Sequence, residues 1–383
     1  MSPMRKTTIP VCAVLGLLLL PTAGQARTVD FGVQAERQGS ETLSREEVMR
    51  MRRGGVKLLR TPLEWEIVQS SGPDQPYDTS NFDRLVEWSR EGDLPKLEIL
   101  PILIGSPAWV EGAESNNEPP TTALDLQRWT TFVTAMVERY GANGPINAWQ
   151  VWNEPNLSAF WTDHDPDVRE YAEFLELTDR AIRNGEARAK TVLAGMPQRP
   201  GAPKPQTDFL RPLYKIKGVR KAFDIVATHP YATSKNQAID SVETIRDLMN
   251  DFNDKRTPIW ITESGFASAG PSHPFRRPGS QQGTELRRVF SAFQREASEL
   301  DIQKVVWFSW RDGDTDPPTL PQNDVWQTYT GLFSFDGDPK ASWDQFARLA
   351  GGDPGSGRIG ADIEPTPPAE EGGLDPQGKA RTP

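Results

Sequence analysis

Residues 149–156 read WQVWNEPN, and the fold of the whole chain can be worked out from this stretch. Its apolar residues predict a short strand, and Pro155, which cannot donate to a β-ladder, marks the end of that strand. The period of two in a strand would place Gln150, Trp152 and Glu154 on one face. Glu154 is therefore expected at the carboxyl end of a strand, where a loop begins.

Residues 258–265 read PIWITESG and have the same form. An apolar run again ends on a glutamate, Glu263, and again a turn-forming residue, Gly265, follows. Two glutamates that end strands far apart in sequence require a fold that brings strand ends together.

Strand-like and helix-like segments alternate along the chain from Val29. The eight strand candidates cover residues 29–35, 56–59, 97–104, 149–154, 191–196, 223–228, 258–263 and 305–310. Most of them are continuously apolar, as expected of strands covered on both faces. Eight such units favour a closed parallel (β/α)₈ TIM barrel forming a single catalytic domain. The alternative is an open doubly wound sheet, which explains less well why chemically reactive residues end strands all along the sequence.

Helix signals fall between these strands. Residues 44–47 form a capping-box pattern that opens a helix, and Gly54 and Gly55 end it. Between residues 124 and 140 the apolar positions repeat every 3.6 residues, as they do on one face of a helix.

The two ends of the chain differ in composition from the middle. Residues 1–26 resemble an export signal, with Arg5 and Lys6 before an apolar run from 11 to 20 and small residues at 23–26. The run is too short to span a membrane as a helix. We therefore expect a secreted protein, extracellular or periplasmic if the source has an outer membrane, with no membrane attachment after cleavage.

The predicted catalytic domain covers residues 27–350. Residues 351–383 carry many glycines and prolines with few bulky apolar residues, which predicts a disordered acidic tail. The only cysteine, Cys12, lies in the signal, so the mature chain is expected to hold no disulfide and no reactive thiolate.

Charge and motif content exclude several classes of function. The formal net charge is -10, which argues against a nucleic-acid partner or an anionic membrane surface. The three histidines (His164, His229 and His273) do not have the spacing of a zinc-binding helix, and no serine-nucleophile elbow is present. Residues 355–360 match a dinucleotide fingerprint formally but lack a strand before them and a helix after them. No metal or other cofactor is therefore expected.

The active site of such a barrel lies at the carboxyl ends of its strands. The polar and aromatic residues predicted there are Arg60, Asn153, Glu154, His229, Tyr231, Glu263 and Trp310. Two carboxylates facing each other across one pocket suit cleavage of a glycosidic bond, in which one donates a proton and the other attacks or activates water.

Several of these motifs resemble those of the large clan A of retaining (β/α)₈ glycoside hydrolases. Residues 152–155, WNEP, resemble the clan's fourth-strand motif, and residues 262–265, TESG, resemble the end of its seventh strand. His229 and Tyr231 are similar to its sixth-strand His-x-Tyr pair. The resemblance covers residues 29 to about 349 and is nearest to families 39 and 5, although the β-sandwich appended in family 39 is missing.

The resemblance implies roles for the site residues. Glu154 would be the acid/base, Glu263 the nucleophile, and Asn153 would hold the 2-hydroxyl of the sugar. Arg60 and Tyr231 would orient Glu263, His229 would line the pocket, and Trp310 would form the floor of a sugar subsite. The implied enzyme is a glycosidase (EC 3.2.1.-) that cleaves β-linked oligo- or polysaccharides by double displacement.

Two alternatives remain open from the sequence. The chain could be a carbohydrate-binding surface protein on a catalytically retired barrel, although retired enzymes usually lose a carboxylate and both are present here. It could also be a hydrolase that trims an exopolysaccharide during export, with the same chemistry in a different biological setting.

Overall fold

A computed structural model describes residues 28–35, 43–112, 117–141, 144–161, 167–198, 204–313 and 325–359. The predicted signal peptide and residues 360–383 of the predicted tail lie outside these ranges. Within them, the helices are too short or too polar to cross a lipid bilayer.

Eight parallel strands form one sheet in the order β5-β4-β3-β2-β1-β8-β7-β6. They are β1 (Asp30–Gln34), β2 (Leu58–Glu64), β3 (Glu98–Ile104), β4 (Ala148–Val151), β5 (Lys190–Val192), β6 (Val226–Thr228), β7 (Ile259–Ser264) and β8 (Ile302–Trp307). Parallel bridges from Val192 to Ile225 and from Pro197 to His229 join the two ends of the sheet. The predicted (β/α)₈ barrel is confirmed.

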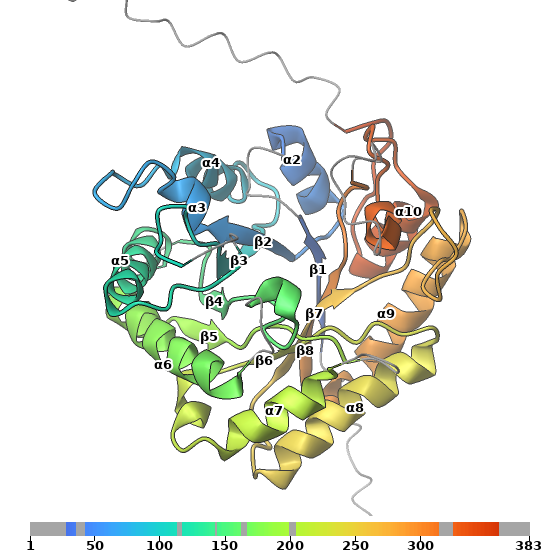
Figure 1. Ribbon diagram of the computed structural model, residues 1–383. Coiled ribbons are helices and arrows are strands. Elements are labelled where there is room, and N and C mark those ends of the chain that lie inside the picture. Colours follow the sequence, from blue (N-terminus) through green and yellow to red (C-terminus); the bar gives the residue numbers. More distant parts are fainter. Residues whose placement is uncertain are drawn as a thin grey trace, which may run out of the picture.

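Helices surround this barrel (Figure 1). They are α2 (Arg45–Arg53), α3 (Trp65–Val68), α4 (Ser80–Trp88), α5 (Ala123–Tyr140), α6 (Val168–Gly185), α7 (Gln206–Lys215), α8 (Lys235–Asp251), α9 (Gln281–Leu300) and α10 (Ala341–Ala350), with short 3₁₀ turns η1 (Ser158–Phe160), η2 (Val219–Ala222) and η4 (Val325–Tyr329). The predicted capping box opens α2, because Ser44 and Glu47 each accept a hydrogen bond from the other's backbone N–H.

The second strand runs further than predicted, to Glu64, although it contains Pro62. The carbonyl of Arg60 accepts from the N–H of Ala35, so the backbone N–H and C=O of Arg60 point toward β1. The backbone groups of Pro62, two residues later, point the same way. Since β1 ends at Gln34, the N–H that Pro62 lacks has no partner strand to pair with. The proline therefore costs no ladder hydrogen bond.

The barrel interior is apolar near the start of the strands and polar near their ends. A small buried cluster fills the lower part: Leu58, Leu100, Ala148, Val192, Ile225, Ala227, Trp260 and Val306. Two residues further along β2 and β4, the side chains of Arg60 and Gln150 are fully buried on top of this cluster. The change from apolar to polar layers places the reactive groups at the carboxyl ends.

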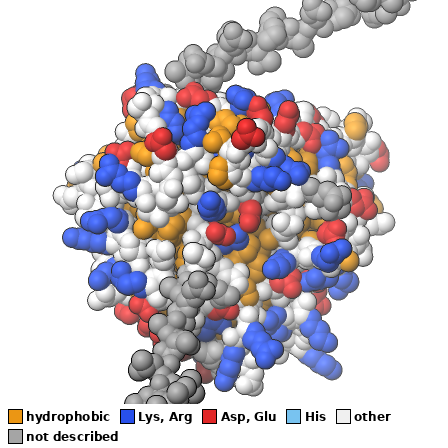
Figure 2. Space-filling view, turned by 180° about the vertical axis from the view of Figure 1, so that it is seen from behind, with side chains coloured by type: hydrophobic (Ala, Val, Ile, Leu, Met, Phe, Trp, Pro, Cys, Tyr) orange, Lys and Arg blue, Asp and Glu red, His pale blue; other side chains and the backbone are white. Residues whose placement is uncertain are grey.

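The view from behind shows side chains of both charges interspersed over the surface, with hydrophobic side chains gathered around the middle of the face (Figure 2).

The predicted tail begins too early. Residues 351–359 pack on the barrel: the carbonyl of Pro354 accepts from the indole of Trp343 at 2.8 Å and from Arg50 at 3.1 Å. Ile359 is 1% exposed, and its N–H donates to the carbonyl of Gly337. This one apolar residue and the carbonyls around Pro354 fold the segment onto α2 and α10, so the prediction is wrong for these residues.

Candidate active site

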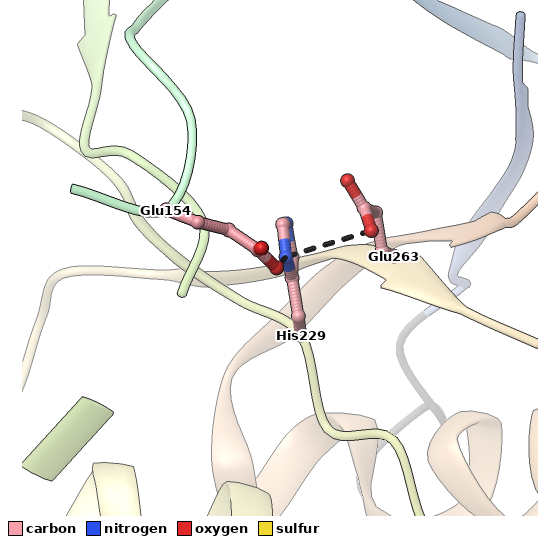
Figure 3. A group of neighbouring side chains, drawn as sticks. All are labelled: Glu154, His229 and Glu263. Atoms are coloured by element: carbon pink, nitrogen blue, oxygen red, sulfur yellow. Dashed lines mark hydrogen bonds and ion pairs between the residues drawn. The ribbon is translucent and has the colours of Figure 1, made fainter. Parts of the chain in front are cut away.

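The two glutamates predicted from the sequence lie at one mouth of the barrel, on either side of His229 (Figure 3). Glu263 belongs to β7, and Glu154 follows β4. The Nδ1 atom of His229 lies 2.7 Å from Oε1 of Glu154 and 3.6 Å from Oε2 of Glu263. One oxygen of each carboxylate and this nitrogen all lie within 4.8 Å of one another. The two carboxylates therefore face one pocket, as cleavage of a glycosidic bond by an acid and a nucleophile requires.

A distorted backbone aims Glu154 into this mouth. Trp152 and Glu154 have φ angles of 67° and 43°, in the left-handed region that non-glycine residues rarely adopt. Each costs on the order of 1 kcal/mol or more and persists only when the surroundings impose it. The N–H groups of the two residues donate to the carbonyls of Leu103 and Gly195. The structure therefore stores strain at this carboxylate.

The distortion also overturns one sequence prediction. Gln150, Trp152 and Glu154 do not share a face, because β4 ends at Val151 and the chain then turns. The fully buried ring of Trp152 points outward and packs edge-on against Phe174 of α6. Because this large ring is anchored between barrel and helices, the residues after it are held in place.

Arg60 is the buried cation of the site. It is fully buried, and its Nη1 donates to Oε1 of Glu263 at 2.6 Å. Its Nη2 donates to Oδ1 of Asn153 at 2.7 Å, and its Nε donates to Oε1 of Gln150 at 2.8 Å. Arg60 thus joins the ends of β2, β4 and β7, as the prediction that it orients Glu263 requires.

Tyr231 completes the contacts of Glu263. Its hydroxyl donates to Oε2 of Glu263 at 2.9 Å. Burial, and next the negative charge of Glu263, raise the pKa of Tyr231 well above its usual range. The phenol therefore keeps its proton, and both oxygens of Glu263 accept a hydrogen bond, one from Arg60 and one from Tyr231.

His229 is neutral. Burial of its ring lowers its pKa to about 3, although the charge of Glu263 opposes this shift. Its Nε2 lies 3.0 Å from the hydroxyl of Thr262. With this hydroxyl donating to Nε2, the N–H on Nδ1 donates to Glu154, so we assign that tautomer.

The ring of His229 needs a glycine beside it. A Cβ atom on Gly195 would lie 2.0 Å from Nε2 of His229 and 2.5 Å from Oγ1 of Thr262. Both distances are far below van der Waals contact, so residue 195 must lack a side chain.

Trp310 does not lie where the sequence prediction placed it. Its ring is 2% exposed, packs against Phe333 and Trp343, and donates its N–H to Glu47 at 3.1 Å. A ring covered on these sides cannot form the floor of an open subsite. Phe308, two residues earlier, is half-buried and lies edge-on to Tyr231 with ring centroids 6.4 Å apart. It is the aromatic ring at the end of β8 that is available to a ligand.

The other predicted residues come together at the mouth, with Asn153 half-buried and Tyr231 7% exposed. Sequence reasoning missed Gln34, Thr262 and Phe308. Gln34 ends β1 and Phe308 follows β8, so the rule that found Glu154 could have found both. The hydroxyl of Thr262 gave no signal, because its role depends on a histidine from another strand.

The site also offers one nitrogen and two carboxylate oxygens close enough to hold a metal ion. These atoms already exchange hydrogen bonds: Oε1 of Glu154 with His229, and Oε2 of Glu263 with Tyr231. Arg60 adds a positive charge next to Glu263. The arrangement can hold one carboxylate ionised and move a proton on the other, as glycosidic bond cleavage requires.

Comparison with known proteins identifies the family of the chain. The sequence profile of a family described as "Cellulase (glycosyl hydrolase family 5)" matches residues 31–313. A "Beta-xylosidase" of Geobacillus stearothermophilus is 27% identical over 187 residues, which are 42% of this chain and 35% of that protein. This chain thus matches only about a third of the length of that relative.

Solved structures share the fold. A monomeric beta-xylosidase from Caulobacter crescentus CB15 superposes with a TM-score of 0.64 at 18% identity, covering 86% of this chain and 69% of that one. A family 39 glycoside hydrolase from the gut symbiont Bacteroides cellulosilyticus WH2 superposes with a TM-score of 0.64 at 20% identity, covering 85% and 64%. At these identities, the likeness establishes the fold alone.

Proposed function

The chain belongs to the cellulase family, glycosyl hydrolase family 5, and on this basis we propose that it cleaves β-linked glycosidic bonds by double displacement, using Glu263 and Glu154. Membership makes it a glycosidase (EC 3.2.1.-) acting on carbohydrate, in a family of retaining β-glycosidases. The assignment of the individual residues is our proposal.

One observation supports the assignment of roles: the two glutamates have partners of different charge. Glu263 forms an ion pair with the buried cation Arg60, whereas the partner of Glu154 at 2.7 Å is the neutral ring of His229. Breaking a buried ion pair costs about 3–5 kcal/mol, and losing a neutral hydrogen bond costs about 1 kcal/mol. The proton of the resting site therefore belongs on Glu154, and Glu263 is the ionised nucleophile.

The reaction then proceeds in two steps. In the first, a carboxylate oxygen of Glu263 bonds to the anomeric carbon, the bond to the leaving oxygen breaks, and that oxygen takes the proton of Glu154. In the second, a water molecule gives a proton to Glu154 while its oxygen displaces Glu263 from the anomeric carbon. Asn153, held by Arg60, is placed to bind the 2-hydroxyl of the sugar.

The choice of sugar is also a proposal. The curated relative is named a beta-xylosidase, which supports testing β-xylosides first. Phe308 offers its ring to one face of the sugar at the end of β8.

The experiment is a screen of nitrophenyl β-glycosides and β-linked polysaccharides, with E263Q and E154Q as matched controls. NMR of the first-formed product should show the β-anomer, and both variants should lose most activity. An α-anomer would rule out Glu263 as nucleophile. Glycan binding without turnover by the wild-type protein would favour the retired-barrel alternative.

We also propose that residues 1–26 direct export and are removed. Their charged start, apolar run and small residues support this. Mass spectrometry of the protein recovered outside the cytoplasm should show a chain that begins at Arg27. A full-length chain retained in the cytoplasm would contradict the proposal.

A further inference from the structure

Arg60 donates hydrogen bonds to four different side chains, and only one of them carries a charge. Its acceptors are the carboxylate of Glu263 and the amide oxygens of Asn153, Gln150 and Gln34. A guanidinium has five N–H donors and no acceptor, so four of the five are used here.

We infer that Gln34 and Gln150 are positioning residues of the reaction, which hold Arg60 through neutral acceptors so that its single positive charge serves Glu263 alone. This inference rests on the proposed role of Glu263 as nucleophile. The two glutamines come from β1 and β4, on opposite sides of β2, which carries Arg60. They fix the guanidinium from two sides without offering it a second negative charge.

Stability of the fold alone does not explain why residue 150 is a glutamine. Its side chain is fully buried, and within the described residues its Nε2 has no hydrogen-bond partner. A buried amide donor left without a partner costs about 1–3 kcal/mol. Ala148, two residues earlier on the same strand, lies in the apolar cluster that fills the lower barrel. An apolar residue would suit this interior better, unless Arg60 needs the amide oxygen.

Chemistry fixes how the glutamine amides are oriented. The guanidinium presents only N–H donors, so an amide nitrogen turned toward it would set donor against donor. The amide oxygens of Gln34 and Gln150 must therefore face Arg60. For Gln150 this leaves Nε2 pointing into the barrel, where it lacks a partner.

The neutral charge of these acceptors is the feature that matters. Glutamate has nearly the same size as glutamine and would still accept from Arg60. It would also add a second carboxylate around one cation, and the two would then compete for that charge. A second negative charge roughly 6 Å from a carboxylate, at an effective dielectric constant of about 20, is enough to move the titration of that carboxylate to higher pH by one unit or more.

The test replaces each glutamine with glutamate and measures the pH profile of kcat/KM on an activated aryl glycoside. In Q150E, and separately in Q34E, the acidic limb should move to higher pH by at least about one unit. Gln34 lies at a strand end and is 7% exposed, so Q34E tests the inference even if Q150E does not fold. If the folded variants show the acidic limb at the same pH as the wild type, the inference is overturned.

Gln206 supplies a matched control. It is also a fully buried glutamine with one amide atom lacking a partner in the described structure, but it bonds to the carbonyl of Ala227 rather than to the site. Q206E should lower the melting temperature and leave the acidic limb in place. An equal shift in Q206E would show that buried charge in general, rather than competition for Arg60, moves the profile.

A separate measurement distinguishes failure of this inference from failure of the proposed function. Wild-type protein treated with an activated 2-fluoro glycoside should carry the sugar on Glu263. If it does and the profiles of Q150E and Q34E match that of the wild type, the inference fails alone. If no sugar is found on Glu263, the proposed function fails, and this inference fails with it.

Discussion

Protonation of His229 is expected to destabilise the protein as the pH falls from 7 to 5. Burial lowers the pKa of this histidine to about 3 in the folded chain, whereas an unfolded histidine titrates near 6.5. Between these values the unfolded state binds more protons than the folded state. The stability from the neutral ring is therefore complete above about pH 6.5 and is lost progressively as the pH falls toward 3.

The magnitude follows from these two pKa values. Between pH 7 and pH 5 this one group lowers the free energy of unfolding by about 2 kcal/mol. The ring is fully buried, so solvent screening does not reduce this figure.

Denaturant unfolding at the two pH values measures the effect. The comparison is between the wild type and H229Q, in which the other titrating groups contribute alike. The drop in unfolding free energy from pH 7 to pH 5 should therefore be about 2 kcal/mol smaller in H229Q than in the wild type. T228V is the control, because Thr228 is buried, precedes His229 in the chain and does not titrate; the difference in stability between T228V and the wild type should be the same at both pH values. A drop in H229Q as large as in the wild type would refute the reasoning.

The remaining predictions concern the acid/base, the ring of the subsite and the chain end. In E154A, azide should restore turnover of an activated aryl β-glycoside and yield a β-glycosyl azide, because the anion needs no base; an α-azide would reverse the roles of the two glutamates. F308A should lower kcat/KM by roughly two- to tenfold, since one ring contact is worth about 0.5–1.5 kcal/mol, and should lower the melting temperature only modestly because Phe308 is half-buried; unchanged kinetics would remove Phe308 from the subsite. Truncation after Ile359 should leave the melting temperature unchanged, whereas truncation after Ala350 should lower it by several degrees, because about 3 kcal/mol of apolar burial and hydrogen bonding is lost; equal melting temperatures would contradict the packing of 351–359.

The sequence was sufficient to predict the barrel and the two glutamates because both depend on local patterns. Apolar runs that end on Glu154 and Glu263 can be read along a single strand, and parallel strands bring their ends to one edge. The register of each strand is harder to predict. The strand before Trp152 ends at Val151, three residues before its predicted end at Glu154, and a left-handed backbone then sends the ring of Trp152 outward.

Contacts between strands could not be predicted from the sequence. Trp310 and Phe308 both follow the eighth strand, and only the packing of Phe333 and Trp343 decides which ring is covered. The neutral acceptors of Arg60 likewise come from strands distant in sequence. The folded end at Ile359 depends on a single apolar residue in a segment whose composition otherwise indicates disorder.

The central claim is that Glu263 attacks the anomeric carbon and Glu154 handles the proton. An activated 2-deoxy-2-fluoro aryl β-glycoside of the best sugar in the screen forms the covalent intermediate but breaks it down slowly. Protease digestion and mass spectrometry should then find one sugar on the peptide that contains Glu263, and none on the peptide that contains Glu154. A sugar on Glu154, or hydrolysis with inversion and no covalent adduct, would contradict the account.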